Sequence, residues 1–93
     1  MTAERAHHFG LVNHLVEDGQ ALEGALALAK RITVNAPIAV WETYGVARMA
    51  VHADEEGLFR ESARAIERVM KTEDFKEGPT AFIEKRAPQW KGR

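Results

Sequence analysis

The stretch DEEGLFRESARAIERVMK, residues 54–71, decides the fold class of this chain of 93 residues. Its apolar residues recur every three or four positions, which places them on one stripe of an α-helix. Asp54 can cap the helix, and Glu55 and Glu56 suit the positive end of its dipole. We therefore predict an amphipathic helix that begins after Asp54. Its stripe comprises Leu58, Phe59, Ser62, Ala63, Ile66, Val69 and Met70.

Two more helices are expected before this one. QALEGALALAKRITVN, residues 20–35, and PIAVWETYGVARMAVH, residues 37–52, each carry an apolar stripe at helical spacing. Asn35 is expected to cap the second of them, and Pro37 to occupy its first turn, where a missing N–H costs nothing. With short connections between the helices, the fold class is all-α: a small helical bundle of three long helices plus short terminal helices.

The N-terminal segment contains shorter pieces. TAERAHH, residues 2–8, predicts a short helix that is capped by Thr2 and ended by Gly10. LVNHLV, residues 11–16, is the only strand-like run, because it contains β-branched residues and lacks helix caps. An isolated strand edge is normally paired or covered, so this run either packs as a loop on the bundle or has its partner strand on another chain or in a missing part of the protein.

The last eighteen residues read KEGPTAFIEKRAPQWKGR, residues 76–93. Gly78 and Pro79 predict a break, after which PTAFIEKR forms a new short helix. On that helix Phe82 and Lys85 are expected to share a face. An aromatic ring beside an ammonium group can hold a planar base next to a phosphate. Spacing alone favours an alternative in which Phe82 is core, Lys85 is a solvated charge and the basic tail is frayed.

Composition limits the classes of protein that fit. The length suits one domain, residues 1–93, and the balance of 45% apolar to 29% charged residues argues against intrinsic disorder. A net charge of −1 gives no general reason to expect nucleic acid or an anionic membrane as partner. There is no cysteine, which excludes disulfides and thiolate chemistry. Because no run resembles a signal peptide or a membrane span, we expect a cytoplasmic location.

Other candidate chemistries have simpler explanations. The histidines lack the spacing of a metal site, so no metal ligand is assigned. Asp54, Glu55 and Glu56 are consecutive and do not converge on one substrate atom. Ser62, on an apolar face, has no histidine at a useful offset. No catalytic residue is therefore assigned. The histidines are His7, His8, His14 and His52.

Four stretches, in this order across nearly the whole chain, carry a family resemblance. They are TAERAHHFGLVNHLV, LALAKRITVNAPIAV, DEEGLFRE and KTEDFKEGPTAFIEKRAPQWKGR. Together they resemble the C-terminal third of the enoyl-CoA hydratase/isomerase (crotonase) family. The last stretch is the most specific, because it is similar to the family pattern ED-x-x-EG-x-x-AF-x-EKR-x-P-x-W.

The resemblance implies a C-terminal helical domain of a crotonase-type enzyme without the N-terminal spiral core. In the family that core binds acyl-CoA, forms the oxyanion hole and, in hydratases, supplies two catalytic glutamates. No residue here matches those positions, so Glu55, Glu73 and Glu84 receive no catalytic role. Strand partners for residues 11–16 would lie in that core, and the native protein either begins at Met1 or extends upstream of it.

The resemblance also implies a role for two residues. In family members the Phe and Lys of the terminal AF-x-EK pattern reach the adenine and phosphate of a CoA that is bound mainly by a neighbouring subunit. The matching positions are Phe82 and Lys85, which are therefore the expected CoA-binding residues. We also expect a homo-oligomer linked to fatty acid metabolism, with acyl-CoA as substrate of the full-length protein and no other cofactor. The alternative is a stand-alone helical protein-interaction module that does not bind CoA.

Overall fold

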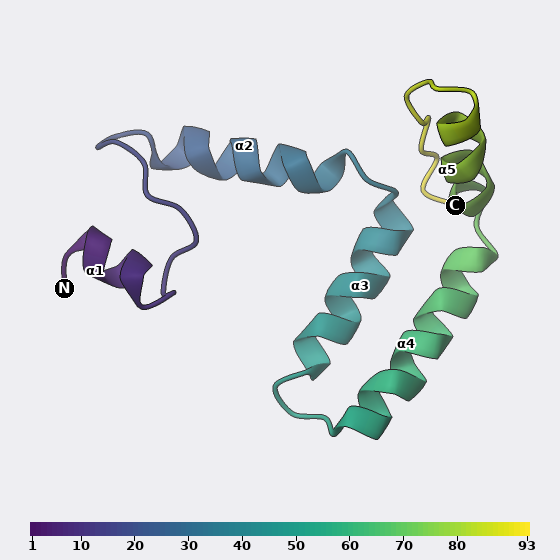
Figure 1. Cartoon of the computed structure of the whole chain (residues 1–93), viewed down its shortest axis with the longest axis horizontal. Coiled ribbons are helices and arrows are strands. Elements are labelled where there is room, and N and C mark those ends of the chain that lie inside the picture. The colour runs from purple at the N-terminus through teal and green to yellow at the C-terminus, as the bar shows by residue number, and fades with distance from the viewer. The chain divides into compact units, whose positions relative to one another are not determined.

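The computed structural model describes all residues, 1–93, and contains five helices and no strand (Figure 1). The all-α prediction is thus confirmed, and the three long helices are α2, α3 and α4. The chain divides into two compact units, Met1–Ile32 and Thr33–Arg93, each described by itself. Whether both belong to one domain stays a prediction. No helix is long and apolar enough to cross a membrane. The helices are α1 Ala3–His8, α2 Ala21–Thr33, α3 Pro37–Met49, α4 Glu55–Met70 and α5 Glu73–Ile83.

In the first unit, α1 begins and ends as predicted. The Thr2 side-chain oxygen accepts a hydrogen bond from the Arg5 N–H at 3.3 Å. After the helix, Gly10 has a φ of 71°, and its N–H donates to the His7 carbonyl. The Leu11 N–H donates to the Ala6 carbonyl at 2.9 Å. This pair of bonds is a Schellman motif, which ends a helix with a left-handed residue.

The strand-like run at residues 11–16 forms no strand in this chain, and the loop that was the alternative is what the structure shows. This segment forms bends and irregular backbone, and its apolar side chains are exposed. A strand needs a neighbour to complete its hydrogen-bond ladder, and the chain supplies none. Val16 instead lies against α2, where a Cβ on Gly24 would come within 2.8 Å of the Val16 side chain. Glycine at position 24 therefore makes room for Val16.

In the second unit, α3 packs on α4 and α4 contacts α5 (Figure 1). Asp54 caps α4 as predicted, because its carboxylate accepts the Gly57 N–H at 2.7 Å. Pro37 occupies the first turn of α3, also as predicted. The prediction that Asn35 caps α3 is wrong: the N-cap residue is Ala36, which makes no side-chain capping bond. The residue before a proline is held out of the helical region, which moves the cap to Ala36.

Ion pairs fasten α3 to α4. Arg68 of α4 donates two hydrogen bonds to the Glu42 carboxylate of α3, at 2.8 and 2.6 Å, and a third to Glu61 at 2.7 Å. The hydrogen bonds from Arg68 hold the pKa of Glu42 and of Glu61 below the usual range, and they raise the pKa of Arg68. Two-pronged pairing of this kind fixes geometry as well as charge, so it sets how the two helices lie together.

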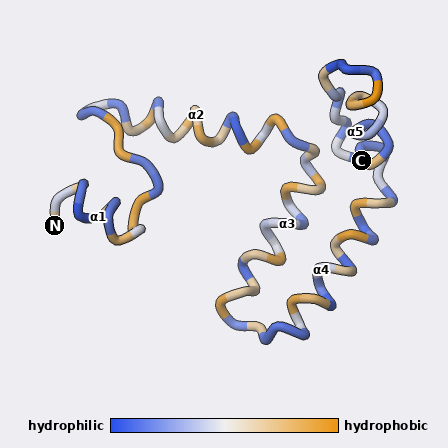
Figure 2. The backbone as a smooth tube through the Cα atoms, viewed as in Figure 1, coloured by the Kyte–Doolittle hydropathy of each residue, from blue (hydrophilic) through white to orange (hydrophobic).

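Very little of the chain is buried. The only buried residues are Ala65, Ala81 and Asp74, and many large apolar side chains are exposed. Figure 2 shows hydrophobic segments recurring along α2, α3 and α4. The amphipathic stripes predicted from sequence are therefore present, but most of their large side chains stay exposed rather than enclosed in a completed core.

Candidate functional site at the end of helix α5

Helix α5 is continuous from Glu73 to Ile83, so the break predicted at Gly78 and Pro79 is wrong. Thr72 caps the helix by accepting the Phe75 N–H at 3.2 Å. Pro79 has no N–H to offer the Phe75 carbonyl, but one missing bond leaves the other turns intact. The chain then folds back on this helix. The Trp90 ring lies so close that a Cβ on Gly78 would be 3.5 Å from it.

Because α5 ends at Ile83, Lys85 lies outside the helix. Lys85 has a φ of 53°, the only positive φ among non-glycine residues. Its N–H donates to the Phe82 carbonyl at 3.3 Å, and the Arg86 N–H donates to the Ala81 carbonyl at 3.1 Å. These bonds form a second Schellman motif. Phe82 and Lys85 thus do not share a helix face as predicted; the motif joins them through the end of α5.

Phe82 is strongly exposed. Its exposed fraction is 85%, compared with 1% for the preceding Ala81. The alternative that Phe82 is a core residue is therefore wrong for this chain. An aromatic ring left this bare at a helix end is available to stack on a planar partner.

The C-terminal tail is not frayed, because a buried carboxylate holds it. Asp74, with an exposed fraction of only 3%, accepts the backbone N–H groups of Lys91 at 2.7 Å and Gly92 at 2.9 Å. The indole N–H of Trp90 donates to the Val34 carbonyl at 2.7 Å. Residues 90–92 therefore connect the beginning of α5 to the segment before α3.

Further along the tail, side chains reinforce this connection. The Glu73 N–H donates to the Arg93 carbonyl at 2.7 Å. Lys91 and Arg93 both pair with the Glu73 carboxylate, at 2.8 and 3.1 Å. These pairs hold the pKa of Glu73 below the usual range, the Lys91 hydrogen bond being the largest cause.

Glu77 is the centre of another group of ion pairs and hydrogen bonds, which includes Arg86, the residue after Lys85. Its carboxylate accepts two hydrogen bonds from the Arg86 guanidinium and one from the Gln89 N–H at 2.7 Å. Arg86 also pairs with Glu84 at 2.6 Å. The Arg86 and Gln89 bonds lower the pKa of Glu77 to about 2, and the carboxylates raise the pKa of Arg86.

Lys85 differs from the other basic residues of the tail. Arg86, Lys91 and Arg93 each pair with a glutamate, whereas the Lys85 side chain has no ion pair or hydrogen bond within the chain. The site thus presents one unpaired ammonium group and one exposed aromatic ring, at the two ends of a hydrogen-bonded turn.

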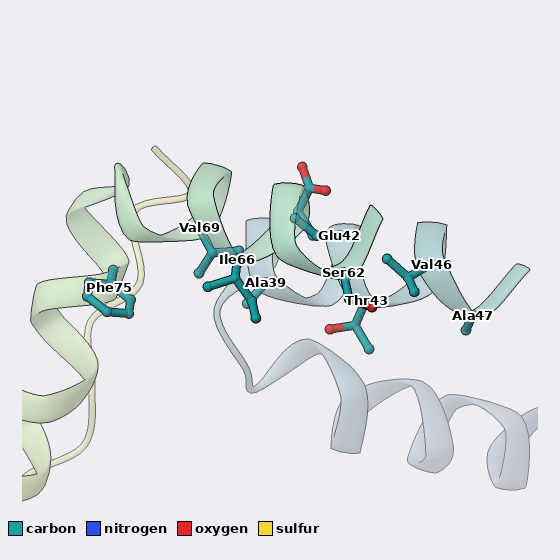
Figure 3. A pocket seen from close by; sticks show the side chains of 10 residues that line it. Ala39, Glu42, Thr43, Val46, Ala47, Ser62, Ile66, Val69 and Phe75 are labelled. Atoms are coloured by element: carbon teal, nitrogen blue, oxygen red, sulfur yellow. The ribbon is translucent and has the colours of Figure 1, made fainter. Parts of the chain in front are cut away.

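Sequence reasoning missed an apolar groove along α3 and α4. The groove has a volume of about 530 Å³ and reaches Phe75 of α5 (Figure 3). Its apolar lining includes Val46, Ile66 and Val69, and Ser62 opens onto it. The stripe of α4 was the available signal, but a groove needs two helices and cannot be read from one. No cluster of three or more His, Asp or Glu side chains is arranged to hold a metal ion.

Comparison with known proteins decides the family. The family model described as Enoyl-CoA hydratase/isomerase matches residues 1–93. The chain belongs to the enoyl-CoA hydratase/isomerase family. The resemblance predicted from sequence is thus confirmed, and the chain corresponds to the C-terminal helical portion of the family's proteins.

Individual relatives are similar to this chain over all or nearly all of its length. The chain is 41% identical to Enoyl-CoA hydratase EchA19 of Mycobacterium tuberculosis, covering all of this chain and 35% of that protein. It is 38% identical to a carnitinyl-CoA dehydratase of Salmonella arizonae, covering 99% of this chain and 37% of the relative. The chain therefore spans little more than a third of the length of these relatives.

Solved structures of the same family show the same fold. A crystal structure of enoyl-CoA hydratase from Mycobacterium tuberculosis matches with a TM-score of 0.93 at 42% identity, over all of this chain and 37% of that one. An enoyl-CoA hydratase from Bacillus anthracis matches with a TM-score of 0.93 at 33% identity, over all of this chain and 36% of that one.

Proposed function

We propose that this chain is the part of an enoyl-CoA hydratase/isomerase family protein that completes a CoA nucleotide pocket and supplies oligomer contacts. Family membership and the relatives' names, which include an enoyl-CoA hydratase and a carnitinyl-CoA dehydratase, support an acyl-CoA ligand. The single observation that carries the nucleotide contact is the pairing of exposed Phe82 with the unpaired Lys85 across the turn that ends α5.

The chemistry of the two side chains suits a phosphorylated nucleotide. An exposed aromatic ring can stack on adenine, a contact typically worth about 1–3 kcal/mol per base. An ammonium group without an internal partner can bind a phosphate by a charge-assisted hydrogen bond. The chain contributes no catalytic residue, so in this proposal it is inactive alone, and the whole protein acts on acyl-CoA in the cytoplasm as part of fatty acid metabolism.

Titration with CoA tests the nucleotide contact. We expect weak binding, with a Kd on the order of millimolar, because only one stacking contact and one ion pair are offered. Phe82→Ala and Lys85→Ala should each weaken binding about fivefold or more, since each removes one of the two contacts. The fluorescence of Trp90 and Trp41 provides the readout.

The matched control is Ile83→Ala. Ile83 lies beside Phe82 at the end of α5 and is also highly exposed, but it offers neither a ring nor a charge. Its replacement should leave CoA affinity unchanged. Equal losses of CoA affinity in all three variants would contradict the proposed contact. So would the absence of binding by the parent chain at about 10 mM CoA.

The second candidate is a stand-alone helical protein-interaction module that does not bind CoA. The observation that favours it is the apolar groove of about 530 Å³ between α3 and α4, together with the many exposed apolar side chains. Large exposed apolar patches commonly mark interaction surfaces. Under this alternative, Phe82→Ala and Lys85→Ala change nothing in a CoA titration, whereas polar substitutions in the groove abolish association.

A further inference from the structure

Lys85 adopts a backbone conformation that its residue type disfavours. The same hydrogen-bond pattern ends α1, where the left-handed position is taken by Gly10 with a φ of 71°. At the end of α5 the position is taken by Lys85 with a φ of 53°. A residue with a Cβ stays left-handed only where the surrounding structure holds it there.

Glu77 of α5 contacts the chain on the far side of Lys85. Its carboxylate bonds to the side chain of Arg86, which follows Lys85 directly, and to the backbone N–H of Gln89 further along. These contacts connect Glu77 on α5 to Arg86 and Gln89, which both follow the left-handed Lys85. The Glu77 side chain is also less exposed than that of Arg86, at 21% compared with 37%.

We propose that Glu77 is a positioning residue, which keeps Lys85 left-handed and so directs its ammonium group away from the glutamates that pair with the other tail cations and toward the nucleotide phosphate. The direction of the Lys85 ammonium group toward a phosphate rests on the proposed function, whereas the role of Glu77 in keeping the Lys85 backbone left-handed does not. Glu84 cannot replace Glu77, because its carboxylate bonds only to Arg86 and not to the backbone beyond the turn.

The first test measures the turn without any ligand. NMR of the 93-residue chain reports the left-handed conformation of Lys85 through the strong intraresidue HN–Hα NOE that this φ produces, and it also gives the protection of the Arg86 N–H from hydrogen exchange. Glu77→Gln keeps the side-chain shape but removes the charge and one acceptor oxygen. We expect the Lys85 intraresidue HN–Hα NOE to weaken as the residue averages over other conformations, and Arg86 exchange to speed up by about tenfold.

A matched control and a second variant keep this test decisive. Glu73→Gln also breaks ion pairs between α5 and the tail, but at Lys91 and Arg93, so it should leave Lys85 unchanged. Arg86→Lys keeps the positive charge and loses the two-pronged bond, so it should act like Glu77→Gln. An unchanged Lys85 intraresidue NOE and unchanged Arg86 exchange in both Glu77→Gln and Arg86→Lys would overturn the proposal.

The second test asks whether the positioning acts through Lys85. Glu77→Gln should weaken CoA binding about threefold in the parent chain and leave it unchanged in the Lys85→Ala background. Equal losses in both backgrounds would show that Glu77 does not act through Lys85 and would overturn its positioning role. If the parent chain binds no CoA, the proposed function fails, while the NMR test still decides whether Glu77 holds the turn.

Discussion

Lys85 and Gly10 end their helices with the same pair of hydrogen bonds, but only Gly10 is the residue type that this geometry prefers. A left-handed conformation costs a residue with a Cβ roughly 1 kcal/mol. The backbone strain therefore falls on Lys85, which is also the one basic residue of the tail without an ion pair. At the residue scale, this coincidence of strain and free charge marks the end of α5 as the functional candidate.

The first residue-scale prediction concerns Lys85→Gly. We expect this variant to raise the free energy of unfolding by about 0.5–1 kcal/mol, because glycine reaches a φ of 53° without a steric penalty. Urea denaturation followed by circular dichroism measures the change. Glu84→Gly is the control, since Glu84 is right-handed and gains nothing from glycine. A Lys85→Gly chain less stable than the parent would contradict this account of strain.

At the element scale, α5 and the tail form one structural piece. Gly78 and Pro79 are strong helix-ending signals when only their neighbours are considered. In the folded chain, the tail returns over this point: Trp90 covers Gly78, Asp74 binds the backbone of Lys91 and Gly92, and the helix continues. Tertiary contacts of this kind routinely override local propensity.

The element-scale prediction is that Asp74→Ala releases the C-terminal tail from α5. Removing the buried carboxylate leaves two backbone N–H groups without their charged acceptor, so we expect a loss of about 2–3 kcal/mol in the free energy of unfolding. Thermal denaturation by circular dichroism measures this loss, and a red shift of Trp90 emission reports release of the tail.

Glu73→Ala is the matched control for Asp74→Ala. Glu73 is the adjacent acid, but its ion pairs with Lys91 and Arg93 are exposed and contribute little. It should therefore lower stability much less than Asp74→Ala does. Equal melting temperatures for the two variants would show that burial of Asp74 is not what holds the tail.

At the scale of the whole molecule, the dominant feature is apolar surface without a core. The buried apolar residues are only Ala65 and Ala81, while Phe59, Ile66 and Trp41 are among the exposed ones. Chains near this size are only marginally stable even when their cores are complete. The groove along α3 and α4 concentrates part of this surface in one place.

The whole-molecule prediction is self-association. We expect the chain to sediment as a species larger than a monomer at high micromolar concentration, because association removes apolar surface from water. Ile66→Glu, in the groove, should shift the distribution toward monomer. Val51→Glu changes a highly exposed valine outside the groove and should have a smaller effect. A parent chain that sediments as a clean monomer would contradict the prediction.

The sequence by itself determined the helices, most of their caps and the family. Thr2 and Asp54 act on N–H groups three residues away, and the apolar stripes depend only on helical spacing. Such features are set by near neighbours in the chain. The family pattern that contains AF-x-EKR likewise pointed to Phe82 and Lys85 as candidate CoA-binding residues from sequence alone.

The tertiary structure alone decided what happens around those two residues. The continuity of α5, the attachment of the tail to Asp74 and the pairing of Arg86 with Glu77 all join residues that are separated in sequence. The irregular backbone of residues 11–16 also depends on distant residues, because no other segment of this chain pairs with them to form a strand. Periodicity and capping describe one segment at a time, whereas these outcomes depend on which other segment supplies the hydrogen bonds and covers the backbone.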